Sequence, residues 1–132
     1  MEEQKLKTVP LFSALGKREL RRVAASTDEV DVREGEQLLN QGTFAHEFMV
    51  VLDGRAEVVR DSEAVAELGP GDFLGEVAAL DHGTRNASVI ARTAMTVAVM
   101  SAGNLRQIAR EMPELGEQLR AAANEHSPLT GG

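Results

Sequence analysis

The feature that most constrains the fold is a series of short apolar segments separated by turn residues between positions 28 and 101. Val30 and Val32 alternate with charged residues, which is the period of a half-buried strand. Residues 46–52 are almost all apolar and predict a strand buried on both faces, and the Asp53-Gly54 pair after it predicts a hairpin turn. Further strands are expected at residues 38–41, 55–60, 64–68, 85–91 and 95–100. About eight short antiparallel strands of this kind indicate a double-sheet jelly roll.

Helical patterns flank the predicted strands. Residues 2–8 are weakly helical, and Pro10 is expected to end that helix. Residues 17–25 carry one apolar stripe, and Ser101 is a suitable N-cap for a helix through residue 110. Pro113 suits the first turn of a last helix. The expected class is α+β, mainly β, with N-terminal helices, a short helix within residues 71–91 and two C-terminal helices.

A chain of 132 residues is long enough for one domain with a proper core. We expect a helical part at 1–27, a jelly roll at 28–101, C-terminal helices at 102–126 and a disordered tail at 127–132, so that one domain covers 1–126. The chain has no cysteine, no apolar run of the ~20 residues that a membrane span needs, and no signal-peptide pattern at its start. These properties predict a cytoplasmic protein without a membrane contact.

The formal net charge is −7, with 21 acidic and 14 basic residues. Because no basic stripe is present to neutralise phosphates, binding to nucleic acid is not expected. The chain has four Phe and neither Trp nor Tyr, so it lacks aromatic platforms for stacked bases.

The stretch from Gly69 to Ala91 contains the residues with the clearest chemistry. Gly75 precedes the apolar run Val77–Leu80, which predicts one or two helical turns. The unpaired N–H groups at the start of such a turn, together with the guanidinium of Arg85, suit phosphate oxygens. Glu76 would repel a phosphate and therefore suits a sugar hydroxyl. The pattern predicts a phosphorylated sugar whose phosphate and hydroxyl are adjacent.

The motif Gly-Glu-Val-Ala-Ala-Leu at residues 75–80, followed by Gly-Thr-Arg-Asn-Ala-Ser at residues 83–88, resembles the phosphate-binding cassette of cyclic nucleotide-binding domains. That module occurs in catabolite-activator-type regulators, cyclic-nucleotide-dependent kinases and gated channels. The Pro-Leu-Phe-x-x-Leu sequence at residues 10–15 and the glycine spacing extend the resemblance over nearly the whole chain.

The resemblance implies a role for individual residues. The cyclic phosphate would contact Arg85 and backbone N–H groups of the cassette, and the ribose 2′-hydroxyl would contact Glu76, with Gly75 close by. Walls for the base would come from the preceding strands. The implied ligand-binding residues are Gly75, Glu76, Val77, Ala78, Arg85, Asn86 and Ala87 in the cassette, and Val58, Val65 and Ala66 on the strands.

Two departures from the family pattern bear on the base. Asn86 stands where family members often have Ala, Ser or Thr, and a hydroxyl at this position tends to accompany tolerance of guanine. Because Asn86 has no hydroxyl, cyclic AMP is the preferred ligand, and cyclic GMP stays an alternative. No aromatic residue follows Phe73, so a cap over the base must be aliphatic or polar, from residues such as Leu119, Ala122 or Ala123, or must come from a partner subunit.

A jelly roll can also serve functions other than cyclic nucleotide binding. A metal-dependent jelly-roll enzyme would need clustered histidines, whereas His46, His82 and His126 are widely separated, so neither an enzyme nor a metal site is expected. The fold could also serve as a ligand-free interaction domain, or as the regulatory part of a larger transcription regulator or enzyme. For a sensor, ligand binding would repack the C-terminal helices, and the partner would be a second copy of the chain or an effector protein.

Overall fold

The computed structural model describes residues 1–42, 47–75 and 87–126, with side chains up to residue 121. Its elements follow the chain in the order α1 (Glu3–Lys7), η1 (Pro10–Phe12), α2 (Lys17–Ala25), β1 (Thr27–Val32), β2 (Gln37–Leu39), β3 (Glu47–Asp53), β4 (Ala56–Arg60), β5 (Glu63–Leu68), β6 (Phe73–Leu74), β7 (Ser88–Ala91), β8 (Met95–Ser101), α4 (Ala102–Glu111) and α5 (Pro113–His126).

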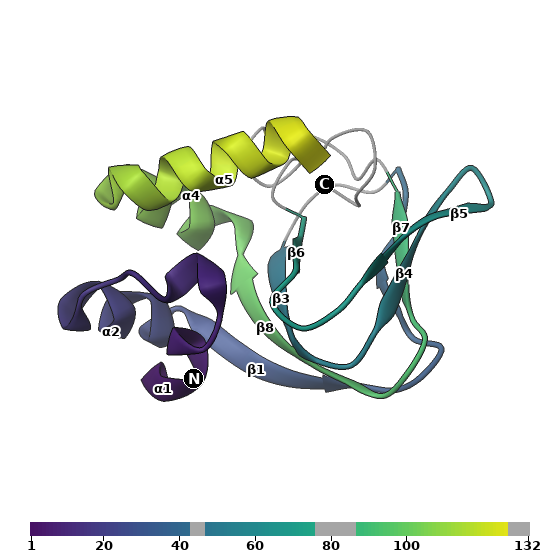
Figure 1. The fold of residues 1–132 in the computed structure, drawn as a ribbon, viewed down its shortest axis with the longest axis horizontal. Coiled ribbons are helices and arrows are strands. Elements are labelled where there is room, and N and C mark those ends of the chain that lie inside the picture. The colour runs from purple at the N-terminus through teal and green to yellow at the C-terminus, as the bar shows by residue number, and fades with distance from the viewer. Residues whose placement is uncertain (43–46, 76–86, 127–132) are drawn as a thin grey trace.

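The strands form two four-stranded antiparallel sheets, with the orders β1-β8-β3-β6 and β2-β7-β4-β5. Figure 1 shows the second sheet on the right, and the helices gathered around the first. The chain passes from one sheet to the other through the turn at Gly54, whose φ of +94° is unfavourable for other residues. The prediction of a mainly β, double-sheet fold with flanking helices is confirmed.

The β1-β8-β3-β6 sheet separates two apolar clusters. Along β3, Met49 and Val51 pack between the sheets, whereas Phe48 and Val50 pack under the helices. All four side chains are at most 7% exposed. The near-continuous apolar run of β3 therefore fills both clusters, as the sequence predicted.

Local capping explains where two helices begin. The Glu19 side chain accepts a hydrogen bond from the Gly16 N–H at 3.0 Å before α2, and the Ser101 hydroxyl accepts one from the Asn104 N–H at 3.1 Å before α4. Both bonds satisfy donors that a helix start leaves unpaired. Pro10 does not simply end a helix, because it opens the short 3-10 turn η1 in the position that suits proline.

The two C-terminal helices pack against each other and on the N-terminal helices. Leu115 and Leu119 of α5 are 3% and 0% exposed, in the same cluster as Leu6 and Phe12. Gly116 lies so close to α4 that an added Cβ atom would be 2.5 Å from the Ala109 carbonyl oxygen. In the described part of the chain, the helices are too short or too polar to cross a membrane.

Candidate functional site

The predicted cassette connects the two sheets. Strand β6 belongs to the β1-β8-β3-β6 sheet and leads to Gly75, whereas Ala87 precedes β7 in the other sheet. The predicted site residues between them, Glu76, Val77, Ala78, Arg85 and Asn86, lie outside the described residues. What the structure describes of the site is therefore its two ends and the strands around them.

Gly75 has a φ of +89° and is buried at the end of β6. This left-handed conformation is open to glycine at little cost and is unfavourable for residues with a Cβ atom. The strand before it is held by the pairing of Leu74 with Met49 and by the ring contact of Phe73 with Phe48, whose centroids are 5.8 Å apart. The cassette thus begins at a fixed backbone position.

The other end of the cassette is equally well fixed. Ala87 is 0% exposed within the cluster between the sheets, where any larger side chain would need space that the core does not provide. The next residue, Ser88, is the register partner of Val59 on β4. Its hydroxyl accepts a hydrogen bond of 2.9 Å from the backbone N–H of Gln41. These contacts position the backbone that follows Arg85 and Asn86 in the sequence.

Gln41 was not among the predicted site residues, yet it joins three segments. Its side-chain amide donates to Asp61 Oδ1 at 2.9 Å, and its Oε1 accepts from the Asp61 N–H at 3.0 Å. Asp61 and Ser62 have φ values of 51° and 68°, as a tight hairpin turn between β4 and β5 requires. Gln41 therefore ties this turn to Ser88. No sequence pattern could have found it, because its partners are 20 and 47 residues away.

The three predicted base-contacting residues lie on adjacent strands with different exposure. Val58 on β4 is 0% exposed and is the register partner of Ala66 on β5, which is half-buried against the same cluster. Val65 is the extra residue of a β-bulge, between the partners of Val58 and Val59, and is 37% exposed. The structure thus brings Val58 and Ala66 together and leaves Val65 at the surface.

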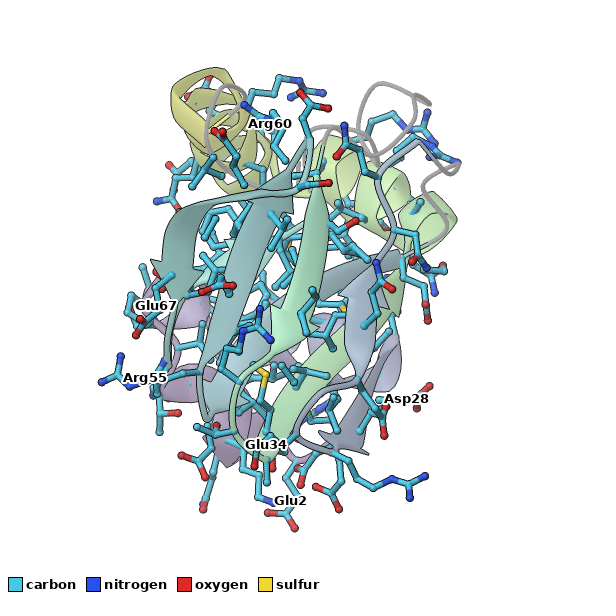
Figure 2. All side chains as sticks on the ribbon, turned by 90° about the vertical axis from the view of Figure 1, so that its right-hand side faces the viewer. Glu2, Asp28, Glu34, Arg55, Arg60 and Glu67 are labelled. Carbon is cyan, nitrogen blue, oxygen red and sulfur yellow. The ribbon has the colours of Figure 1, made fainter. Side chains whose placement is uncertain are left out.

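Arg60 ends β4 at the same end of the sandwich as α5. Figure 2 shows this arginine at the end of the molecule where α5 lies and, at the opposite end, Glu2 and Glu34. The first end carries both signs of charge, since Arg60 is followed by Asp61 and Glu63 in the β4–β5 hairpin. This end also carries the hairpin turn at Asp61 and the start of β7.

The fold and the position of the cassette in it define a class of protein. It is a two-sheet β domain in which the stretch from Gly75 to Ala87, with one arginine, connects the sheets. The family model for the cyclic nucleotide-binding domain matches residues 29–112. The chain belongs to this family, so the predicted family and the jelly-roll fold are confirmed.

Individual relatives agree with this assignment. The chain is 34% identical, over 97 residues, to a cAMP-dependent protein kinase regulatory subunit of Schizosaccharomyces pombe, and the match covers 73% of this chain and 24% of that protein. The regulatory domain of a Toxoplasma gondii protein kinase A, crystallised with cAMP, has a TM-score of 0.83 at 23% identity and matches 93% of this chain and 48% of that one.

A third similar structure is the regulatory subunit of a cAMP-independent protein kinase A from Trypanosoma brucei, with a TM-score of 0.77 at 22% identity, covering 87% of this chain and 44% of that chain. These two structures show that the fold is shared. The chain spans about a quarter of the length of the curated kinase regulatory subunits that it matches.

Proposed function

We propose that this chain is a regulatory module that binds a cyclic nucleotide, with cyclic AMP preferred over cyclic GMP. The observation that carries the proposal is the match of residues 29–112 to the cyclic nucleotide-binding domain, with the motif residues Glu76 and Arg85 present within the matched range. The positions of Gly75 after β6 and of Ala87 before β7 support it, because these strands belong to the two sheets that the cassette connects.

In this proposal Arg85 pairs with the cyclic phosphate. A guanidinium is planar and permanently charged, so it can donate two parallel hydrogen bonds to phosphate oxygens. Backbone N–H groups near Val77 and Ala78, and at Asn86 and Ala87, add further donors.

Glu76 accepts a hydrogen bond from the ribose 2′-hydroxyl, while the Gly75 backbone lies close to the sugar. The base packs on the β4–β5 side of the site. Val58 and Ala66 are register partners there and offer an apolar surface, and Val65 contributes from the bulge. The preference for cyclic AMP rests on Asn86. In the family, a hydroxyl side chain at this position tends to accompany tolerance of guanine, and Asn86 has no hydroxyl.

The module has no catalytic role in this proposal, since a binding domain transmits its signal by a shift between conformations. The output is a repacking of α4 and α5. Leu119 is fully buried with the N-terminal helices in the described conformation, so it would have to leave that cluster to cover a base. One domain over residues 1–126 with a tail at 127–132 is the proposed extent, and the partner is a second copy or an effector protein.

The site is tested by calorimetry with cyclic AMP, cyclic GMP and 5′-AMP. A micromolar ligand corresponds to about −8 kcal/mol, and each charge-assisted hydrogen bond contributes roughly 1.5–3 kcal/mol. Arg85→Ala should therefore weaken cyclic AMP binding at least about 100-fold. Glu76→Ala should weaken it roughly tenfold to 100-fold and reduce discrimination at the ribose. The matched control is Arg33→Ala, which removes the same charge from a side chain that is 93% exposed.

Wild-type affinity in Arg85→Ala would refute the assignment of the phosphate contact. A second candidate function is a ligand-free interaction domain, and the regulatory subunit of a cAMP-independent kinase has the same fold. It predicts no thermal shift with either cyclic nucleotide. A bound ligand at ~100 times its Kd instead stabilises the fold by about 2.7 kcal/mol.

The repacking of the helices has its own measurement. Because the sequence contains no cysteine, a pair of introduced cysteines can be spin-labelled without background. Labels at Glu117→Cys on α5 and Glu67→Cys on β5, both exposed, report the distance between helix and sheet. We expect the distance distribution to change on addition of cyclic AMP. An unchanged distribution at saturating ligand would contradict the repacking while leaving the binding proposal intact.

A further inference from the structure

The helix-facing side of the β1-β8-β3-β6 sheet is covered by helices over only part of its length. Along β8, Ala98 is buried under the helices, whereas Thr96 on the same face is half-exposed. The same change occurs along β1, where Thr27 is buried but Glu29 and Asp31 are exposed. Figure 1 shows both strands continuing to the right, beyond the N-terminal helices. Part of this sheet face is therefore open.

Three polar side chains form a row across the open part. Thr96 is the register partner of Asp31 on one side and of Asp53 on the other. Its hydroxyl donates to Asp31 Oδ1 at 3.2 Å. Adjacent strands are about 4.8 Å apart, so the two aspartates stand roughly 10 Å from each other. Among the ion pairs of the described residues, none includes either aspartate.

This row lies between two hollows. A cavity of about 670 Å³ lies on the α1 side, and a cavity of about 530 Å³ lies beyond it. Both are lined by Asp53 and Thr96, so they lie next to each other, and we call them together the carboxylate trough. Its α1 side has an apolar wall of Pro10, Leu52 and Pro70. The trough thus combines an apolar surface with two carboxylates, those of Asp31 and Asp53, that take part in no ion pair among the described residues.

The charge of the trough is strongly one-sided. Its basic residues, Lys5 and Arg33, are each paired with a glutamate of the trough itself, at 2.9 Å to Glu29 and 3.2 Å to Glu36. The hydrogen bond from Lys5 to Glu29 and the charge of Glu29 raise the pKa of Lys5, and the charges of more distant acidic residues add to this shift. The acidic residues that line the trough are Glu2, Glu29, Asp31, Glu36 and Asp53.

We propose that the carboxylate trough binds a basic, extended segment of a partner protein, with two Lys or Arg residues and a nearby aliphatic residue. In an extended chain, side chains at i and i+2 stand about 7 Å apart on one face, and long basic side chains can span the remaining distance to Asp31 and Asp53. The aliphatic residue packs on the wall of Pro10 and Leu52. Complementary charge makes such a partner specific and speeds its association.

The presence of two neighbouring cavities, both lined by Asp53 and Thr96, favours a peptide over a compact ligand, because an extended chain can contact both. The trough residue Glu2 lies away from the end of β4. Figure 2 shows Glu2 and Glu34 at the end of the molecule opposite Arg60. Peptide binding can therefore be measured without nucleotide, and its result does not depend on the proposed function.

The test begins with selection of dodecapeptides from a random display library on the immobilised protein. Selected peptides are then synthesised with a fluorescent label, and their affinities are measured by polarisation. The site variant is D31N/D53N, which keeps size and shape at two exposed positions. The matched control is E114Q/E117Q, which makes the same charge change at two exposed positions on α5. Denaturation midpoints of both variants check that the fold is unchanged.

We expect the selected peptides to be enriched in Lys, Arg and aliphatic residues. Their affinity should fall about tenfold in D31N/D53N and less than twofold in the control, since several partly exposed charge contacts are lost in one case only. Replacing the aliphatic residue by serine should weaken binding as well. Selection without basic enrichment, or an equal loss of affinity in both variants, would overturn the proposal. Displacement of the peptide by an equal concentration of spermine would also overturn it, because the site would then recognise charge alone.

Discussion

The contact between the two C-terminal helices makes a quantitative prediction for Gly116→Ala. An added Cβ atom would lie 2.5 Å from the Ala109 carbonyl oxygen and 3.3 Å from its carbonyl carbon. These are backbone atoms of α4, so the clash cannot be relieved by rotating a side chain. Leu115 and Leu119 anchor α5 on either side, which opposes a shift of the whole helix.

Two effects of opposite sign determine the outcome. Alanine is favoured over glycine inside a helix by about 1 kcal/mol. Overpacking at a rigid contact costs about 1–3 kcal/mol, and the backbone neighbour of Gly116 places this site in the upper half of that range. We therefore expect a net loss of about 1–2 kcal/mol in the free energy of unfolding. For a domain of this size, that loss lowers Tm by roughly 3–8 °C.

The matched control is Gly103→Ala in α4. An added Cβ atom there meets nothing closer than the Arg106 Nη2 atom, at 4.0 Å. Helix propensity is then the dominant effect, and a gain of about 0.3–1 kcal/mol is expected. Urea denaturation of both variants, with midpoint and m-value compared to the wild type, shows whether each substitution raises or lowers the free energy of unfolding. If Gly116→Ala were as stable as Gly103→Ala, α5 would not press on the Ala109 carbonyl, and the reasoning would be wrong.

Two further substitutions test local features of the fold. Gly54→Ala should destabilise the domain by at least about 2 kcal/mol, because Gly54 has a φ of +94° and its added Cβ atom would lie 2.5 Å from the Ala94 carbonyl oxygen and 2.7 Å from Met95; thermal unfolding that matched the wild type would contradict this. Ser101→Ala should cost about 1 kcal/mol through the lost cap to the Asn104 N–H, and Ser101→Asp, which keeps an acceptor, should retain most of the stability measured by urea titration.

Local sequence patterns were sufficient for most elements of the fold. Alternation predicted β4 and β8 to within a residue or two, and the predicted bounds of α2 agree with Lys17–Ala25. The pattern did not predict η1 or β6. Each is only two or three residues long, and neither has a period that a sequence can display. The motif also predicted the family, because its spacing comes from one continuous stretch of chain.

Gly116 shows how a local rule can mislead. In sequence terms it weakens a helix, because glycine has low helix propensity. In the structure it allows α5 to approach the Ala109 carbonyl, so the same residue supports the packing of two helices. Gln41 is a second case, since its bonds to Asp61 and Ser88 depend on how three separate segments meet.

The sequence by itself determined which segments are strands and helices, that the chain resembles cyclic nucleotide-binding domains, and which residues carry the phosphate-binding motif. These properties depend on neighbours in the chain, through side-chain alternation and short spacing. Only the tertiary structure decided that Asp31, Thr96 and Asp53 form one row. Such a row is set by strand order and register, and these depend on which apolar faces are buried together.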